Sequence, residues 1–265
     1  ERSVVSPLTL IASAFAPVAD VRRTLDPVLV DVRDSCLLLI HLGSNRLGGS
    51  ALGQAYRQIG NEAPDVDDPD QFRQMIEFIL NIKRRGLVLS MHDRSDGGAL
   101  VAVLEMIFSS RIGADINIPV GYESLSFLFN EEVGFIVQVT NDQASRVIEE
   151  CPVHAELIAR LRMDEEVSIS QSEEELYRSN RGELQGYWAL TSYKMQALRD
   201  EENCAREEHS LVAMGRNDDP GLSCGLTYDL NHDICSVYVG TSQRPKVAVI
   251  REQGVNGQLE MAAAF

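Results

Sequence analysis

The feature that most constrains the fold of this chain is the alternation of short apolar runs with helical patterns through its first two thirds. Such alternation is typical of mixed α/β architecture. The strands that we predict are Ser35–Leu42, Leu87–Met91, Ala114–Ile118, Val133–Thr140 and a hairpin of Val167–Gln171 with Glu174–Arg178. The helices that we predict are Ser50–Ile59, Pro69–Arg85, Ala99–Ser110, Tyr122–Phe129 and Gln143–Arg162, the last as one helix or as two broken by Pro152. The sequence therefore predicts an α/β (α+β) fold in which helices accompany a mixed sheet.

The helix that begins at Pro69 has the clearest pattern. Asp68 can cap it, and proline suits the first helical position, where a missing N–H costs no hydrogen bond. Gly86 can end the helix. The apolar side chains at helical spacing are Phe72, Met75, Ile76 and Ile79. We therefore expect Ile76 and Ile79 to face the sheet.

The remainder of the chain has a different character. Glu183–Arg199 has a helical pattern, whereas residues 200–245 are polar and show no clear period beyond a possible strand at Leu226–Leu230, so we interpret them as a connector. Lys246–Ile250 is a short apolar strand candidate, and Glu260–Phe265 has the pattern of a helix that has only begun. This ending, and an apolar start without methionine, lead us to expect an internal piece of a longer protein.

Composition excludes several kinds of partner. The chain carries 40 acidic and 24 basic residues, a formal charge of −16, and such a surface repels the phosphate backbone of nucleic acids. No apolar run approaches the roughly 18 residues that indicate a membrane span. The five cysteines are scattered, without a Cys-x-x-Cys pair or zinc spacing, so we expect reduced thiols in a cytoplasmic protein.

The run from His92 to Gly98 contains the residue types of a metal and phosphate site. It follows a predicted strand and opens a predicted helix. Asp93 and Asp96 offer the hard oxygen ligands that Mg²⁺ prefers. The two glycines allow close approach of the backbone, and a helix N-terminus donates N–H groups to an anion. The same residues also fit a simple cap and turn whose acids complement the helix dipole.

A second glycine-containing turn runs from Asn45 to Ser50. Gly48, Gly49 and the Ser50 hydroxyl can present hydrogen-bond donors to a phosphate. Arg46 can add positive charge. The turn is not a Walker A motif, because the Gly-Lys-Ser/Thr ending is absent. An ordinary turn with Ser50 near the helix cap fits equally well.

Three further groups of residues complete the candidates. The acidic run Asn130-Glu131-Glu132 either lines a polar site or forms a solvent-exposed turn. The aromatic residues Tyr187, Trp188 and Tyr193 are interpreted as packing residues. The histidines His41, His154, His209 and His232 have no nucleophile or ligand partner at a readable spacing, so we assign them no chemistry.

Several runs of residues also stand in a particular order along the chain. They are Ser13–Val18 with Asp20–Leu25, Asn45–Leu52, Gly60–Asp65, His92–Gly98, Phe129–Glu132, Thr191–Gln196 with Leu198–Asp200, and Arg244–Phe265. In order and spacing this series is similar to the large, single-chain form of formylglycinamide ribonucleotide amidotransferase (phosphoribosylformylglycinamidine synthase). A single motif would be a weak signal, whereas a series that covers essentially the whole chain is specific.

The resemblance implies an assignment for each part of the chain. Residues 1–178 are similar to the C-terminal domain of the second synthetase half, whose fold is that of aminoimidazole ribonucleotide synthetase. Residues 179–243 resemble the connecting helix and linker, and residues 244–265 the truncated start of a class I glutaminase domain. The Cys, His and Glu triad of the family's glutaminase lies beyond Phe265, so no catalytic residue is expected in this chain.

The resemblance also implies ligands and a reaction. Asp93 matches the family's Mg²⁺ ligand. The residues that we expect to contact ATP are Ser95, Gly97, Gly98, Gly48, Gly49 and Ser50. The family converts formylglycinamide ribonucleotide to the amidine with ATP and glutamine-derived ammonia in purine biosynthesis, and the missing domains of the same polypeptide would be partners. The alternative is a non-catalytic lobe whose Mg²⁺–nucleotide site is auxiliary and structural. In either case the chain alone is expected to be inactive.

Overall fold

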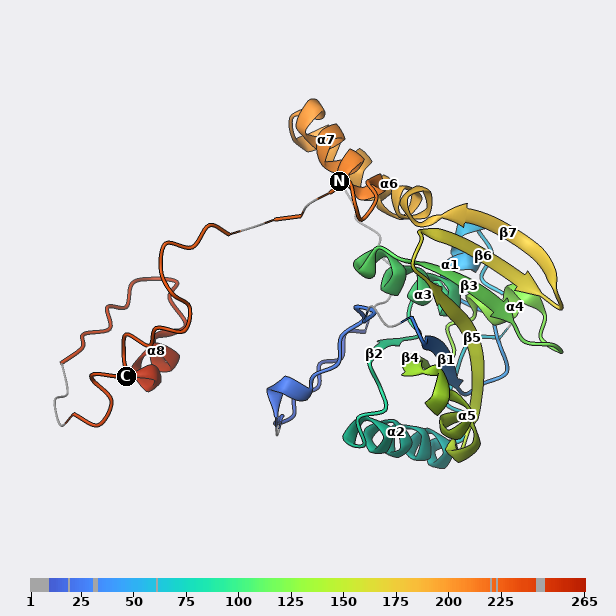
Figure 1. Cartoon of the computed structure of the whole chain (residues 1–265), viewed down its shortest axis with the longest axis horizontal. Helices are drawn as coiled ribbons and strands as arrows, with labels where there is room; N and C mark the ends of the chain where they lie inside the picture. Colours follow the sequence, from blue (N-terminus) through green and yellow to red (C-terminus); the bar gives the residue numbers. More distant parts are fainter. Residues whose placement is uncertain are drawn as a thin grey trace, which may run out of the picture. The chain divides into compact units, whose positions relative to one another are not determined.

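The computed structural model describes residues 10–18, 20–30, 33–60, 62–219, 221–222, 224–241 and 246–265. The chain divides into two compact units, residues 1–220 and residues 221–265. The first unit contains every strand of the described residues and all helices except the last one (Figure 1). Residues 1–9, at the start of the expected first domain, and residues 242–245, where the expected connector meets the expected glutaminase segment, lie outside the described residues.

The first unit is built on one mixed sheet of seven strands. They are β1 (Ser35–His41), β2 (Ser90–Asp93), β3 (Gly113–Ile118), β4 (Gly134–Thr140), β5 (His154–Arg162), β6 (Glu166–Gln171) and β7 (Glu174–Asn180). Their order across the sheet is β2-β4-β1-β5-β3-β6-β7, and all neighbours are antiparallel except the parallel pair β3 and β6. The predicted mixed sheet is therefore confirmed, and the hairpin of β6 with β7 forms as expected.

Strand β1 lies inside the sheet, between β4 and β5, and is the most deeply buried strand, with all seven residues buried. Successive side chains of a strand point to opposite faces, so a fully apolar run supplies two cores at once. Leu37 and Leu39 belong to the core on one face, whereas Cys36, Leu38 and Ile40 belong to the core on the other. The continuous apolar run in the sequence thus reflects a sheet that is covered on both sides.

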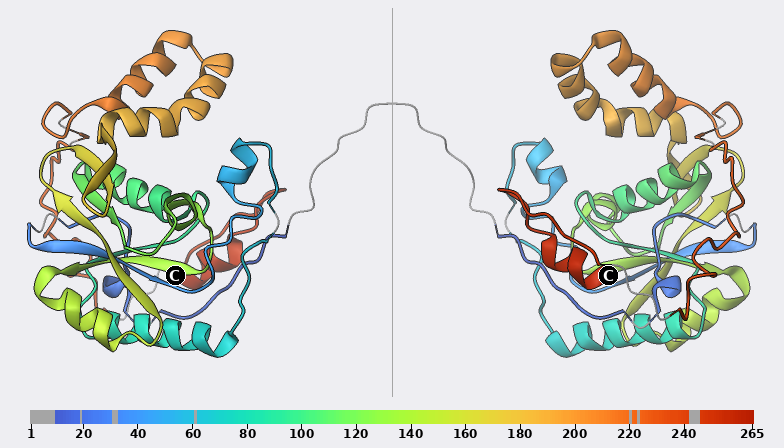
Figure 2. Two further views of the ribbon diagram at one scale, coloured as in Figure 1. Left: turned by 90° about the vertical axis from the view of Figure 1, so that its right-hand side faces the viewer. Right: turned by 90° about the vertical axis from the view of Figure 1, so that its left-hand side faces the viewer.

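Helices cover both faces of this sheet. The first core contains α3 (Gly98–Ser110) and α4 (Ser124–Phe129), and the second contains α2 (Pro69–Arg84) and α5 (Asn141–Glu150). Figure 2 shows the sheet edge-on between these two layers. The C-terminal end of β2 and the N-terminus of α3 meet at the run from His92 to Gly98, so this loop emerges at one end of the layered unit.

Helix α2 follows the cap pattern in the sequence. The Asp68 carboxylate accepts from the N–H groups of Asp70 and Gln71 at 2.9 and 3.1 Å. Its buried side chains are Met75, Ile79 and Ile82. Ile76, which we expected on the same face, is only half-buried and lies outside the core. The buried face therefore includes Met75 and Ile79, as predicted, but it extends to Ile82 and not to Ile76.

The prediction of helix throughout residues 143–162 was wrong in its second half. Helix α5 ends at Glu150. Pro152 follows in the bend, and a proline disfavours helix at the residue before it, which explains why the helix stops there. His154–Arg162 then forms β5, which pairs with β1 on one side and with β3 on the other. Ladder hydrogen bonds along both edges outweigh the helix propensity of this apolar and charged segment.

Two helices extend the first unit beyond the hairpin of β6 and β7. They are α6 (Arg181–Arg199) and α7 (Glu202–Ala213), and α6 contacts α3. Arg181 is fully buried and donates to the Glu165 carboxylate at 2.5 Å and to the Val212 carbonyl at 2.7 Å. The compact unit therefore continues past residue 178, where the sequence suggested a boundary, and α7 occupies part of the expected connector. The division into three domains remains a prediction.

The shorter elements complete the description. In the first unit η1 covers Val21–Arg23 and α1 covers Ala51–Ala55, and in the second α8 covers Gln258–Ala264. The structure assigns no strand to Leu226–Leu230 or Lys246–Ile250, so both strand predictions were wrong for these described residues. No helix in the described ranges is long and apolar enough to cross a membrane.

The two isoleucines of α2 provide a test of this packing. Ile79→Asp should lower the free energy of unfolding by about 3 kcal/mol or more, because Ile79 is 5% exposed and a buried carboxylate without a partner is costly. Ile76→Asp should cost about 1 kcal/mol, since its side chain is partly solvated. Urea unfolding followed by circular dichroism measures both. Equal losses would mean that α2 is oriented differently.

Candidate functional site

The loop between β2 and α3 exposes two carboxylates and a hydroxyl. Asp93 is the last residue of β2, and its side chain is 70% exposed. Its Oδ2 accepts from the Ser95 hydroxyl at 2.7 Å. Asp96 is exposed as well. This part of the loop therefore presents oxygen ligands to solvent, as the sequence pattern indicated.

Arg94 fixes the same loop from inside. Its side chain is buried, and Nε donates to the Glu132 carbonyl at 2.6 Å, while Nη2 donates to the carbonyls of Leu42 and Val133 at 3.2 and 3.1 Å. Burial lowers the pKa of Arg94 to about 10, although the Glu132 charge opposes this shift. The guanidinium therefore stays charged at neutral pH and ties the base of the loop to the loops that flank β1 and β4. No pattern of neighbouring residues indicated this role of Arg94.

The two glycines of the loop serve backbone packing. Gly98 has a φ of +73°, and a Cβ there would lie 2.6 Å from the Leu128 carbonyl oxygen, so only glycine fits. The Gly97 N–H donates to the Glu131 carboxylate at 2.8 Å. The same carboxylate oxygen accepts from the N–H of Ala51, the first residue of α1, also at 2.8 Å. Glu131 therefore supplies an internal anion where two helices begin.

The turn at Asn45–Ser50 is likewise satisfied internally. The Gly48 N–H donates to the Glu62 carbonyl at 2.7 Å, and the Gly49 N–H to the Ile59 carbonyl at 2.6 Å. The Ser50 hydroxyl is buried and donates to the Leu47 carbonyl at 2.7 Å. It also caps α1. These groups have a structural role in this conformation, and contact of Gly48, Gly49 and Ser50 with a nucleotide remains a prediction.

Glu132 and Arg46 form the buried ion pair of the site. The Glu132 side chain is fully buried and accepts from Arg46 Nε at 2.6 Å and Nη2 at 3.0 Å. Backbone N–H groups of Ser44 and Arg46 add two bonds of 3.2 Å. The guanidinium also donates to Asp67 at 3.1 and 2.9 Å. Burial pushes the pKa of Glu132 upward, but these hydrogen bonds outweigh it and hold that pKa below its ordinary value.

Asn130 completes this group of buried polar residues. It is fully buried, and its amide donates to Asn45 Oδ1 at 3.0 Å and to the Ser126 carbonyl at 2.6 Å. The sequence left open whether Asn130-Glu131-Glu132 line a polar site or form an exposed turn, and the exposed turn is the wrong alternative. The signal available in the sequence was the polar run itself, next to an apolar helix and a strand.

His41 is a buried histidine at the end of β1. Its ring stacks on His154 with centroids 5.5 Å apart and lies edge-on to Phe127. Burial, with the positive charge of Arg94 and the neighbouring His154, lowers the pKa of His41 to about 3, although the Leu42 backbone and Glu132 oppose the shift. The ring is therefore neutral at physiological pH and acts as a packing group.

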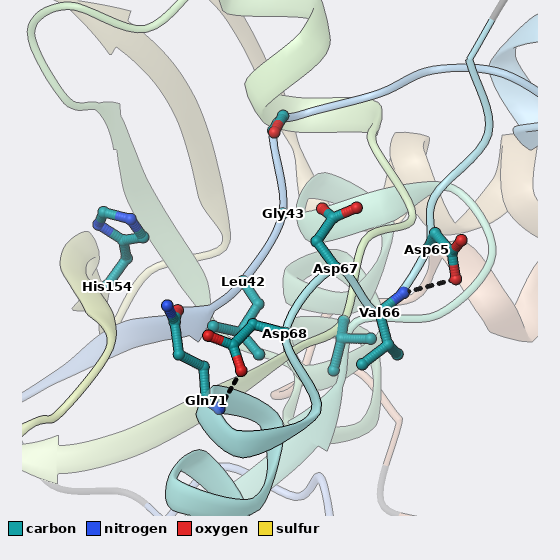
Figure 3. Close-up of a pocket in the computed structure, with 10 residues that line it drawn as sticks. Leu42, Gly43, Asp65, Val66, Asp67, Asp68, Gln71 and His154 are labelled. Carbon is teal, nitrogen blue, oxygen red and sulfur yellow. Dashed lines mark hydrogen bonds between the residues drawn. The ribbon is translucent and has the colours of Figure 1, made fainter.

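A cavity of about 160 Å³ adjoins the Arg46 and Glu132 pair but contains no residue of the loop at Asp93. Its lining comprises Leu42, Gly43, Ser44, Asp65, Val66, Asp67, Asp68, Gln71, Val133 and His154. Figure 3 shows the three aspartates along the segment that leads into α2, with the Asp68 carboxylate bonded to Gln71. Clustered carboxylates repel phosphate, so this cavity does not fit a nucleotide.

The donor set at the loop fits part of a magnesium site. An exposed carboxylate at Asp93 is a suitable ligand, since Mg²⁺ is commonly bound by one or two carboxylates together with phosphate oxygens and water. Within the residues that the structure describes, no group of three or more His, Cys, Asp or Glu side chains converges to hold a metal. A complete site would therefore need further ligands from the nucleotide, from water or from another domain.

Comparison with known proteins identifies one family and a set of similar folds. The model of the C-terminal domain of AIR synthase related proteins matches residues 37–170, from β1 to β6. T. maritima PurL complexed with FGAR is similar with a TM-score of 0.52 and 18% identity, over 62% of this chain and 30% of that chain. PurLQS from Thermotoga maritima has a TM-score of 0.50 and 18% identity, over 61% and 27%. At these identities the likeness shows a shared fold, and the chain spans less than a third of either structure's length.

The buried ion pair leads to a stability prediction. Glu132→Gln should lower the free energy of unfolding by about 3–5 kcal/mol, because removing one partner of a buried pair leaves the other charge uncompensated. The matched control is Glu77→Gln, which breaks an exposed pair with Arg73 and should cost less than about 1 kcal/mol. Urea unfolding at pH 7 measures both variants. A loss for Glu132→Gln as small as the control's would refute the assigned role.

His41 leads to a pH prediction. Its pKa is about 3 in the folded state and 6.5 as its ordinary value, so between these values only the unfolded state binds the proton. The free energy of unfolding should therefore fall as the pH falls below 6.5, by up to about 1.4 kcal/mol per pH unit from this group. His41→Phe should remove this slope between pH 7 and 5, whereas His209→Phe should keep it. An unchanged slope in His41→Phe would contradict the assignment.

Proposed function

Since the chain belongs to the family of AIR synthase related proteins, whose C-terminal domain model matches just over half of it, we propose that it is part of an ATP- and glutamine-dependent ligase. The proposed reaction converts formylglycinamide ribonucleotide to formylglycinamidine ribonucleotide in purine biosynthesis, in the cytoplasm. The observation that carries the proposal is the fold of residues 37–170 combined with the ordered series of motifs. The fold shared with T. maritima PurL in its complex with FGAR supports the choice of substrate.

The proposal gives each part of the chain a place in a longer enzyme. We assign residues 1–178 to the C-terminal domain of the second synthetase half and residues 244–265 to the start of a glutaminase domain. Residues 179–243 join them, with α6 and α7 packed against the first domain. The missing domains would supply the remaining ligands and the ammonia, so the chain by itself should have neither ligase nor glutaminase activity.

In this function the loop at Asp93 binds the metal and the nucleotide. Asp93 would ligate Mg²⁺, and the Ser95 hydroxyl, 2.7 Å from that carboxylate, would orient it and contact ATP. Bound Mg²⁺ would neutralise phosphate charge while the amide oxygen of the substrate is phosphorylated and then displaced by ammonia. Gly97 and Gly98 shape the start of α3, because their N–H groups are bonded within the chain to Glu131 and to the Ser95 carbonyl.

A second candidate is a nucleotide site that stabilises the fold without turnover. In both candidates a phosphate gains few backbone donors from this conformation, because the N–H groups of Gly48, Gly49 and Gly97 are bonded internally. Both candidates use Asp93 in the same way. They differ in what is lost when the carboxylate is removed.

Asp93→Asn in the complete enzyme should weaken Mg²⁺-dependent nucleotide binding by about tenfold or more, because an amide keeps the shape and removes the charge that binds a hard cation. Ser95→Ala should weaken it less, since one neutral hydrogen bond contributes about 0.5–1.5 kcal/mol. Asp70→Asn, a change at an exposed carboxylate of α2 away from the loop, is the control and should leave the affinity unchanged. Isothermal titration calorimetry measures the affinities.

Turnover and melting temperature of Asp93→Asn separate the two candidates. A catalytic site predicts reduced turnover with a melting temperature near that of the parent. A structural site predicts loss of nucleotide during purification and a lower melting temperature, with nearly normal turnover of the folded fraction. If binding, stability and turnover are all unchanged, Asp93 is a turn carboxylate and the proposed role is wrong.

A further inference from the structure

Trp188 of α6 is linked to the loop at Asp93 by a series of polar contacts. Its indole Nε1 donates to Glu105 Oε1 at 3.2 Å. The other oxygen of that carboxylate lies 3.2 Å from His92 Nε2. The opposite ring nitrogen of His92, Nδ1, lies 2.7 Å from the Asp93 carbonyl oxygen. The series therefore joins three elements, α6, α3 and β2, and ends at the backbone of the proposed metal ligand.

Glu105, the middle residue of this series, lies in α3 close to the loop at Asp93. Glu105 lies seven residues after Gly98 in α3, which is about two helical turns, so the two residues share a face of the helix. Its carboxylate side chain is 30% exposed, and the His92 ring is 16% exposed. Partial burial strengthens these interactions relative to an exposed pair, because the effective dielectric constant is lower.

Trp188 is held equally firmly on its own helix. Its ring packs on Phe108 of α3, with centroids 5.9 Å apart. Arg181, two turns earlier in α6, is fully buried and anchors the start of the helix to Glu165. The hairpin of α6 and α7 is therefore fixed at its base, while Trp188 remains 57% exposed, so that its indole is sensitive to changes at the surface.

We propose that Glu105 is a positioning residue for the loop at Asp93. Trp188, and with it the hairpin of α6 and α7, contributes to this positioning through its contact with Glu105. This inference rests on the proposed function only for the identity of the ligand. Glu105 orients the His92 ring, and the ring holds the Asp93 carbonyl and with it the direction of the carboxylate. The indole N–H of Trp188 in turn keeps the Glu105 carboxylate from rotating away.

Amide hydrogen exchange on the complete 265-residue chain tests the positioning role without any ligand. Glu105→Gln should make the amides of residues 93–98 exchange about tenfold faster, because His92 then loses its contact with the carboxylate charge; tenfold corresponds to about 1.4 kcal/mol. Trp188→Phe, which keeps an aromatic ring and removes the N–H, should have the same direction and a smaller size. Glu77→Gln in α2 is the matched control. Unchanged exchange at residues 93–98 in Glu105→Gln would overturn the proposal.

Fluorescence supplies a readout that loss of stability alone would not change. Trp188 is the only tryptophan of the chain, so its emission reports this position alone. MgATP binding at Asp93 should shift the emission of the parent. Glu105→Gln should abolish this shift at saturating MgATP, with binding followed by calorimetry. A shift that persists in Glu105→Gln would overturn the coupling.

The two proposals can fail separately. If calorimetry on the complete enzyme shows that the parent and Asp93→Asn bind MgATP equally, the role of Asp93 fails. The positioning role of Glu105 is then decided by hydrogen exchange at residues 93–98, which needs no ligand. Faster exchange in Glu105→Gln supports it, and unchanged exchange refutes it.

Discussion

The buried ion pair of Glu132 with Arg46 is the interaction on which the end of the sheet depends. Its carboxylate joins the loop after β1 to the loop before β4, and Arg46 extends the connection to Asp67, ahead of α2. The carbonyl of the same Glu132 accepts from Arg94, at the base of the Asp93 loop. A buried charge is tolerated only when its hydrogen bonds are complete, so these loops must be arranged together.

The neighbouring residue, Glu131, decides what kind of site this end of the sheet can offer. Its carboxylate occupies the N–H groups of Ala51 and Gly97, where two helices begin and where an external anion would otherwise bind. The groups left facing solvent are oxygens, at Asp93, Ser95 and Asp96. Such an arrangement suits a cation. It favours phosphate contact through a bound metal more than through a cradle of backbone donors.

The hairpin of α6 and α7 extends the unit in a way that bears on this loop. Arg181 fastens its base, and Trp188 contacts both Phe108 and Glu105 on α3. The interpretation of Trp188 as a packing residue is thus confirmed by its contact with Phe108, while its N–H gives it a second, polar contact. Because α3 begins at the Asp93 loop, a helix far along the chain contributes to the order of that loop.

The sequence by itself determined the elements whose signals are local. The cap at Asp68, the apolar run inside β1 and the loop from His92 to Gly98 each depend on neighbouring residues, and each was predicted from them. Only the tertiary structure decided the rest. Residues 154–162 became a strand because β1 and β3 offered ladder bonds along both edges. Glu132 became a buried anchor because Arg46, 86 residues earlier, lies against it. A contact at that separation leaves no periodicity in the sequence, since it is fixed by how the loops meet in space.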